Sequence, residues 1–266
     1  MARSTARLAV VATPIAACAL LLVPSSASAQ EMAPPPPPPM TTTVETKSEV
    51  SDHSLVVGRL GIGYFGQFDV PLGAPLAAGG EGAPQPAQVI GVRYWMQEKV
   101  GLDLGLGWAM RSGSNTADGT SVDRASTLTL ALRGGLPISL FDSKHYTFFI
   151  EPEIAYGHAG ETIKAIAPGG GAPTPADTSL AGHRFAIGAK AGAEVHFGFI
   201  GIPQLSLDAT VGLDLDVSGG STKGQRPGAA AGQTVENSYS QLELRTLSFH
   251  QPWNIFISNV AAIYYF

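Results

Sequence analysis

The sequence predicts an all-β protein, an eight-stranded antiparallel up-and-down transmembrane β-barrel formed by residues 54–266. Three observations predict this fold. Apolar residues alternate with polar residues or glycine in successive segments, long and short links alternate between those segments, and the charges of the segments fall on one face. Alternation with a period of two is typical of strands with two unlike faces. A closed barrel is the non-helical structure that crosses lipid with its backbone groups paired.

Residues 1–29 have the pattern of a secretory signal peptide. Arg3 and Arg7 precede an apolar run over 8–23, and the small residues 27–29 form a cleavage site before Gln30. A membrane anchor is less favoured because Pro14 interrupts a run that is short for a spanning helix. A second alternative places a lipid on Cys18, the only cysteine, which follows a lipobox-like sequence. With Cys18 removed, the mature chain has no thiol for disulfide, nucleophilic or metal chemistry.

Residues 30–53 are predicted to be a proline-rich periplasmic linker. Six consecutive prolines, 34–39, favour an extended polyproline conformation. We interpret this segment as a solvated tether, with a ligand for a proline-recognising partner as the alternative. Cleavage after Ala29 would leave 14 basic and 21 acidic side chains. This acidic balance argues against a nucleic-acid partner.

The strands are expected in eight alternating segments. They are 55–68, 88–96, 100–111, 128–138, 146–158, 183–197, 204–217 and 254–266. The links 69–87, 112–127, 159–182 and 218–253 are long, whereas 97–99, 139–145 and 198–203 are short. Short periplasmic turns and long extracellular loops are typical of outer-membrane barrels. Residues 239–249 also alternate, so the last long link is expected to hold a strand-like extension or to mark a misplaced strand boundary.

The charged residues of these segments lie opposite the large apolar side chains, which predicts an interior charge network. The predicted lumen charge network comprises Arg59, Arg93, Asp103, Arg133, Glu151, Glu153, Arg184, Lys190, Glu194, Asp208, Asp214 and Asp216. Arg111 shares this face. Basic and acidic groups could pair there and offset the cost of their burial. An eight-stranded barrel has an interior just wide enough for side chains to fill.

Aromatic residues gather near the ends of the apolar face, as expected where lipid meets water. Those assigned to the outer rim are Tyr64, Phe68, Trp108, Tyr156 and Phe185, and those assigned to the periplasmic rim are Tyr146, Phe148, Phe197, Tyr264 and Phe266. A soluble barrel with the apolar face inside is the alternative. It would leave the charges facing water but would not explain the alternation of link lengths.

The last strand closes on Phe266, with Val260, Ala262 and Tyr264 on the same face. In this ending and in its architecture, the region 55–266 resembles the OmpA/OmpX-like family of eight-stranded outer-membrane barrels. The resemblance implies that these four residues form a C-terminal insertion signal read by the outer-membrane assembly machinery. Ala262 is smaller than the residue that the family usually places there.

No catalytic, cofactor-binding or metal-binding motif is apparent, and no cofactor is expected. Ser248 and His250, with Glu243, are the nearest approach to a nucleophilic site, but they lack the surroundings that catalysis needs. His158 and His183 could lie near each other at the outer rim as a weak metal pair. Interface histidines without a ligand are the favoured interpretation.

The sequence therefore predicts a non-enzymatic integral protein of the bacterial outer membrane, in contact with lipid and lipopolysaccharide, that presents four extracellular loops in a structural or surface-interaction role. A narrow porin-like channel and a lipid A-modifying barrel enzyme are the alternatives.

Overall fold

The computed structural model describes residues 50–74, 83–117, 120–123, 125–165, 177–225, 233–246 and 259–266. All of them belong to one compact unit, Lys47–Phe266. The described part is all-β apart from the helix α1 (Asp52–Val56) and the 3-10 helix η1 (Gly198–Ile200). Its strands are β1 (Leu60–Leu72), β2 (Ala83–Gln97), β3 (Val100–Arg111), β4 (Ser114–Ala117), β5 (Thr120–Asp123), β6 (Ser126–Gly135), β7 (Ile138–Asp142), β8 (Tyr146–Ile163), β9 (Thr178–Phe197), β10 (Ile202–Gln225), β11 (Thr234–Arg245) and β12 (Val260–Tyr265).

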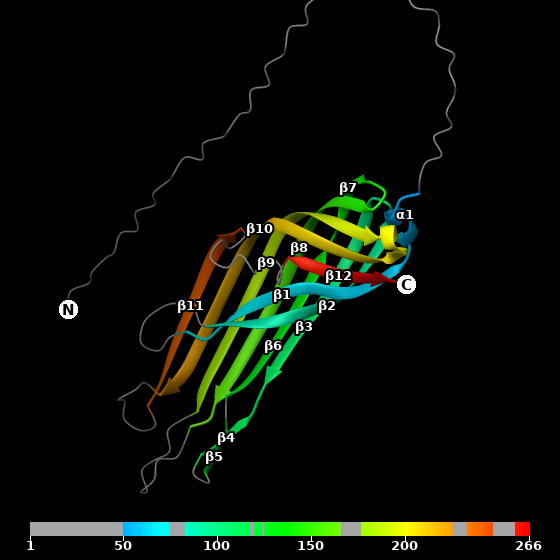
Figure 1. Cartoon of the computed structure of the whole chain (residues 1–266). Helices are drawn as coiled ribbons and strands as arrows, with labels where there is room; N and C mark the ends of the chain where they lie inside the picture. Colours follow the sequence, from blue (N-terminus) through cyan, green and yellow to red (C-terminus); the bar gives the residue numbers. More distant parts are fainter. Residues whose placement is uncertain are drawn as a thin grey trace, which may run out of the picture. The chain divides into compact units, whose positions relative to one another are not determined.

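The main sheet is antiparallel, and its hydrogen bonds form a closed ring (Figure 1). The ring runs β1, β2, β3, β6, β8, β9, β10 and β12, and β12 pairs with β1 again. Each ring strand pairs with the ring strands before and after it in the sequence. The all-β class, the antiparallel pairing and the order of the strands are therefore confirmed.

Several strands are longer than their apolar alternation. β3 has the predicted bounds, but β8 continues to Ile163, β9 begins at Thr178 and β10 continues to Gln225. In β10 the extension is polar and glycine-rich, yet its backbone stays paired with β9 as far as Lys223. The sequence pattern marks only the part of a strand that carries apolar side chains, whereas backbone pairing continues beyond it.

The predicted strand-like extension in the last long link is present as β11. It pairs with β10 from Asp214–Arg245 to Gln225–Thr234. β12 pairs with β10 over Leu205–Ala209. On its opposite edge, β10 pairs with β9 along both the part that faces β12 and the part that faces β11. β11 and β12 therefore follow one another along the same edge of β10. Residues 247–258, between them, lie outside the described residues.

The folded region begins earlier than the predicted boundary at residue 54. Ser51 caps α1, its Oγ accepting a hydrogen bond of 3.2 Å from the Ser54 N–H. Asp52 and His53, predicted to end the linker, are buried in α1. The expected strand from residue 55 begins instead at Leu60. The short apolar run 55–57 does not distinguish helix from strand by periodicity, and the serine cap favours the helix.

β1 contains a bulge that reverses which residues face inward. Its pairing with β2 shifts register between Tyr64 and Gln67, where Gly66 has a φ of +86°. An extra residue in a strand exchanges its two faces beyond that point. Phe65 is buried, and Phe68 packs against the interior rather than on the outer face. The structure thus corrects the assignment of Phe68 to the outer aromatic rim.

Beyond the bulge, β1 crosses the inner faces of β8, β9 and β10, and Figure 1 shows β1 and β2 running obliquely across these strands. The Gly73 N–H donates to the Ala181 carbonyl at 3.2 Å, and the Ala74 N–H donates to Thr222 Oγ1 at 2.7 Å. A Cβ at Gly182 would lie 1.7 Å from the Pro71 carbonyl oxygen, so this close approach requires glycine. The β1–β2 hairpin therefore fills part of the interior.

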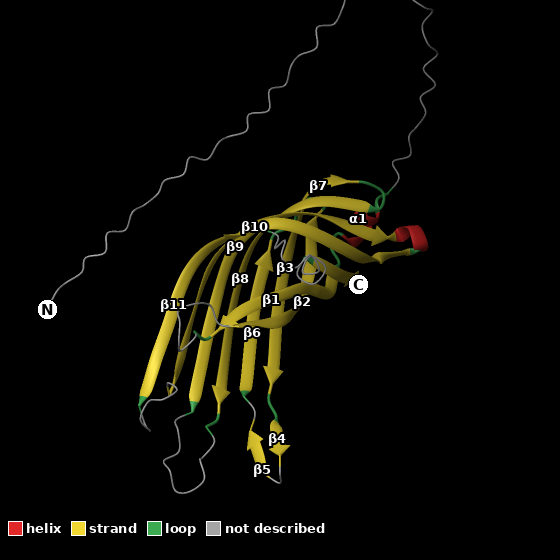
Figure 2. Cartoon of the chain, turned by 60° about the vertical axis from the view of Figure 1, so that its left-hand side comes forward, coloured by secondary structure: helices red, strands yellow, loops and turns green. Residues whose placement is uncertain are grey.

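The two ends of the ring differ. Figure 2 shows α1 and the C-terminus at one end of the sheet and the small β4–β5 hairpin at the other. The turns 98–99, 143–145 and 198–201 lie at the first end, where they contact α1. In the described ranges, no helix is long and apolar enough to cross a membrane.

Candidate functional site: a charged interior closed by a helix

The ring carries apolar side chains outside and charges inside. Leu104, Leu132 and Leu213 are each more than half exposed on the outer face. The equivalent outward side chains along the ring are Ile90, Leu106, Trp108, Leu130, Ile154, Tyr156, Ile187, Val211 and Leu215. A soluble protein seldom exposes an apolar surface this continuous. This distribution is the inverse of an ordinary soluble core.

Arg93 is the centre of the charged interior. Its guanidinium donates Nε–H to Asp103 Oδ1 at 2.8 Å and Nη2–H to Asp103 Oδ2 at 2.6 Å, because the two residues are cross-strand partners on β2 and β3. Nη1 lies 2.9 Å from Asp208 Oδ2 and 3.2 Å from Glu194 Oε2. The Arg93 side chain is 1% exposed, so these ion pairs are shielded from water.

Aromatic rings surround the same guanidinium. The Arg93 Cζ atom lies 5.4 Å from the ring centroid of Phe149, 5.7 Å from that of Phe65 and 6.0 Å from that of Trp95. Cation–π attraction is strongest where the cation is removed from water. The rings also fill the interior on either side of the charges.

Arg133 and Lys190 form a second group with two glutamates. Arg133 Nε lies 2.9 Å from Glu153 Oε2, and Arg133 Nη2 lies 3.7 Å from Glu151 Oε1. Lys190 forms an ion pair with Glu153 and is the cross-strand partner of Glu151. Arg133 Nη1–H also donates to the Phe65 carbonyl at 2.7 Å, which ties this group to the bulge in β1.

A third group joins the ring to the hairpin inside it. Arg184 donates two hydrogen bonds to Asp216, at 3.0 and 2.8 Å, and a third to the Asp69 carbonyl at 3.1 Å. Its guanidinium carbon lies 4.6 Å from the ring centroid of Phe68. Arg245 of β11 reaches Asp216 at 3.2 Å and was missed by the sequence analysis. The sequence predicts this strand only as an extension of the last long link, and it does not indicate which side chains of the strand face inward.

The structure brings every residue of the predicted lumen charge network to the inner face except Arg59. Arg59 precedes β1 and is exposed, and Arg111 at the end of β3 is exposed as well. The alternation was extended past the true start of β1, which explains the error at Arg59. Asp214 lies on the inner face, partly buried, and its Oδ1 has no hydrogen-bond partner among the described residues.

Neutral partners of the network were also missed. Glu194 Oε1 accepts hydrogen bonds from Ser206 Oγ at 2.6 Å and Tyr265 Oη at 2.8 Å. Trp95 Nε1–H donates to Tyr265 Oη at 3.2 Å, and the Ala261 N–H donates to Asp208 Oδ1 at 3.0 Å. The inward parity of Tyr265 was available from the sequence. Its partner depends on cross-strand register, which the sequence does not reveal.

The space left beside Arg93 is small. A cavity of about 10 Å³ lies among Phe65, Arg93, Arg133, Asp208 and Ala261. This is about the minimum needed for a single water molecule. At this level the interior described by the structure is filled by side chains.

The helix α1 closes one end by contacting all three short turns. Asp52 Oδ2 lies 2.6 Å from His145 Nδ1 and accepts a hydrogen bond of 3.1 Å from the Gly198 N–H. His53 Nε2 lies 2.8 Å from the Glu98 carbonyl oxygen. The His53 ring meets Trp95 edge to face, with centroids 4.5 Å apart. Two adjacent residues thus join the turns β2–β3, β7–β8 and β9–β10.

At the other end, Lys164 and Asp177 bridge the two sides of the β8–β9 link. Lys164 Nζ donates to Asp177 Oδ2 at 2.8 Å, and the Ala165 N–H donates to Asp177 Oδ1 at 2.9 Å. The hydrogen bond from Lys164 contributes most to lowering the pKa of Asp177 below its usual value, and the backbone hydrogen bond from Ala165 lowers it further. Because both side chains are exposed, this pair contributes little to stability.

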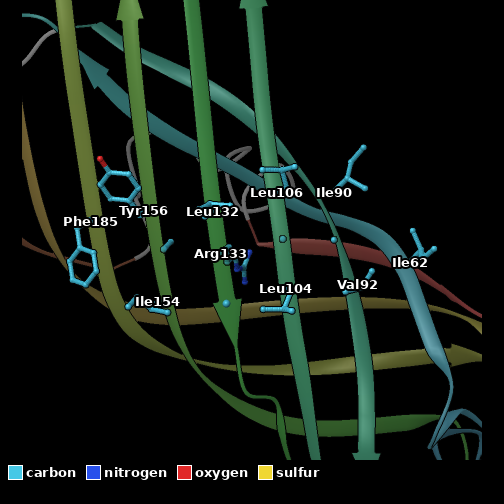
Figure 3. A pocket seen from close by; sticks show the side chains of 14 residues that line it. Ile62, Ile90, Val92, Leu104, Leu106, Leu132, Arg133, Ile154, Tyr156 and Phe185 are labelled. Carbon is cyan, nitrogen blue, oxygen red and sulfur yellow. The ribbon is translucent and has the colours of Figure 1, made fainter.

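The outer face has a shallow apolar groove of about 650 Å³ (Figure 3). It crosses β1, β2, β3, β6, β8 and β9 and is lined by Ile62, Ile90, Val92, Leu104, Leu106, Leu132, Ile154, Tyr156 and Phe185. At Gly134 the lining has no side chain, and a Cβ there would meet Ile154 and Leu104 at ordinary contact distance. The groove is part of the apolar outer face.

The predicted C-terminal signal lies on the outer face of β12. Ala262, Tyr264 and Phe266 are exposed, and Val260 is partly buried. The intervening Ala261, Ile263 and Tyr265 are buried in the interior. The alternation is thus confirmed, whereas the use of these residues as an insertion signal stays a prediction. Ser248 and His250 lie outside the described residues.

No protein-family model matches the chain, and no curated protein matches it either. We therefore infer the function from the geometry of the ring and its charged interior.

Proposed function

We propose that the chain is a non-enzymatic integral protein of the bacterial outer membrane. In this proposal the closed ring is an eight-stranded transmembrane β-barrel with lipid around it, and its long links face the outside of the cell. The barrel serves as a rigid, closed scaffold that presents these links in a structural or surface-interaction role.

The inverse distribution of side chains carries this proposal. Burying a large aliphatic side chain in an apolar medium is favourable by about 1.5–3 kcal/mol. The outward residues of the ring, such as Leu104 and Leu213, lose this contribution in water. Arg93 and its carboxylates are meanwhile paired inside. A lipid surround accounts for both observations, whereas a soluble barrel accounts for neither.

Aromatic side chains and link lengths support the orientation. Tyr146 and Phe148 are exposed at the start of β8 and Tyr264 near the end of β12, which is the end that holds α1, whereas Trp108 and Tyr156 are exposed in the second halves of β3 and β8. Aromatic girdles mark the two interfaces of outer-membrane barrels. The short turns lie at the α1 end, which we assign to the periplasm. The proline-rich linker then belongs to the periplasm, as the sequence predicts.

The close packing of side chains around Arg93 favours a closed scaffold over a narrow channel. An ion would have to pass Arg93, where the remaining cavity is about the size of one water molecule, and then the contacts of α1. We therefore expect planar bilayers that contain the purified protein to show no reproducible single-channel conductance. Steady conductance steps would favour the channel alternative instead.

Cell fractionation and gel mobility test the proposal itself. The protein should sediment with the outer membrane, resist extraction by high salt, and migrate faster on denaturing gels when unboiled than when boiled. A periplasmic protein that stays in solution without detergent would contradict the proposal. Lipid A of unchanged mass in expressing cells would agree with a non-enzymatic role.

A further inference from the structure

Two histidines lie side by side on the outer face of the ring. His158 of β8 and His183 of β9 are direct cross-strand partners in the antiparallel register. Both side chains are exposed. In the part of the chain that the structure describes, neither ring takes part in a hydrogen bond or an ion pair, so their ring nitrogens are available to a ligand.

The backbone beneath these histidines is rigid. β8 is paired with β6 and β9, and β9 is paired with β8 and β10, so neither strand is a sheet edge at this level. Side chains directly opposite on antiparallel strands have Cβ atoms about 4.5–5.5 Å apart. Two imidazoles at this separation can bind one ion, since metal–nitrogen bonds are about 2.0–2.1 Å long.

The surroundings of the pair leave room for an ion and its water ligands. Toward the outer end, the next outward pair on the two strands is Gly160 and Ala181, and a Cβ at Gly160 would meet nothing within 4 Å. On the other side, Tyr156 and Phe185 form an apolar cross-strand pair. The site is thus open toward Gly160 and shielded toward Tyr156 and Phe185.

The His183 side chain must change rotamer before its ring can bind the same ion as His158. Its ring now lies over Gly219 on β10, where a Cβ would be 2.9 Å from the His183 Cε1 atom. An exposed side chain changes rotamer in picoseconds to nanoseconds, so the barrier to this rotation of the His183 side chain is small. The missing side chain at Gly219 allows this resting position of the ring.

From this register and exposure we propose that His158 and His183 form a surface site for a borderline divalent transition-metal ion. Imidazole nitrogen suits Cu²⁺, Ni²⁺ and Zn²⁺, and water would complete the coordination. The described residues contain no cluster of three or more metal-ligating side chains, so within this part of the chain the site has two protein ligands. The proposal does not depend on where the protein resides, because it rests on the pairing of β8 and β9.

Titration of the full chain in detergent micelles with Cu²⁺ tests this site. Electron paramagnetic resonance should detect one strongly bound equivalent whose spectrum shows coupling to two equatorial nitrogens. His158→Ala and His183→Ala should each weaken binding by about tenfold or more, as expected when a metal site is damaged. The double substitution should be little worse than either single one, because the two residues act as one site.

His145→Ala, in the turn bound by Asp52, and His250→Ala are the matched controls and should bind Cu²⁺ like the parent. Wild-type binding by both His158→Ala and His183→Ala, or loss in only one of them, would overturn the proposal. Unboiled gel mobility shows that each variant is folded before titration.

Discussion

At the residue scale, the network is organised by Arg93 and the carboxylates of four strands around it. Burying charges costs free energy that close pairing offsets, so removing one partner leaves the others uncompensated. Arg93 lies within 4.0 Å of carboxylate oxygens of Asp103, Glu151, Glu194 and Asp208. This crowding makes the arginine side chain the most sensitive single position that we identify.

Arg93→Ala should lower the free energy of unfolding by about 3–5 kcal/mol, because it leaves buried carboxylates without their cation. Denaturant unfolding in detergent, followed by tryptophan fluorescence, measures this loss. Arg59→Ala changes an exposed arginine that the structure places outside the network, and it should stay within about 0.5 kcal/mol of the parent. Equal stability of the two variants would show that the network is not structural.

The inward charges could be predicted from the sequence because the alternation of the strands is regular, but their partners could not. Asp208 and Arg93 are distant in sequence and meet only because the ring closes. Arg59 was misplaced because the same alternation was read through residues that form α1 and a turn. Tyr265 faces inward by the same parity, yet its bond to Glu194 requires the register of β10 and β12.

At the element scale, the eight strands of the ring and their order could be predicted, while β7 in the expected short link 139–145, the β4–β5 hairpin, α1, the bulge and the path of the β1–β2 hairpin could not. The pattern of apolar residues marks a strand wherever one face meets an apolar medium. The bulge at Gly66 turns β1 inward beyond this pattern, and α1 follows from a local serine cap. Both features depend on backbone geometry that periodicity does not record.

Gly182→Val should displace the β1–β2 hairpin from the interior, since its side chain would occupy the position of the Pro71 carbonyl. Limited proteolysis of the folded protein in micelles should then cleave within 67–88 much faster than in the parent. Gly160→Val is a matched control on the neighbouring strand, where a Cβ has open space. Cleavage at the parent rate in Gly182→Val would show that the hairpin does not pack on β9.

Asp52→Ala should loosen α1 without unfolding the ring. The substitution removes the contacts to His145 and Gly198, and hydrogen bonds to charged groups contribute about 1.5–3 kcal/mol each. Hydrogen exchange should accelerate at the Gly198 amide and in α1 but not in β3 or β6. Leu55→Ala, an exposed position on the same helix, should leave these rates unchanged. Uniform acceleration throughout the sheet would contradict a local role.

At the scale of the whole molecule, two segments of the chain obstruct the interior of the ring. α1 binds the short turns at one end, and the β1–β2 hairpin lies across the inner faces of β8–β10 further along. Between them, the ion pairs and aromatic rings around Arg93 fill the middle. A ring packed in this way resists deformation from within, which suits the scaffold role that we propose.

We propose that the outer face of the ring meets lipid while the charged interior does not. Trp108 is 57% exposed on the outer face, whereas Trp95 is fully buried beside Arg93. Two single-tryptophan variants separate these positions. Trp253→Phe combined with Trp95→Phe leaves Trp108, and Trp253→Phe combined with Trp108→Phe leaves Trp95.

The decisive measurement is fluorescence quenching by brominated lipids after both variants are reconstituted into vesicles. Bromine on the acyl chains should strongly quench the variant that keeps Trp108 and leave the variant that keeps Trp95 nearly unchanged. Absence of quenching at Trp108, or equal quenching at Trp95, would contradict the account of a lipid-facing outer surface around a closed, charged interior.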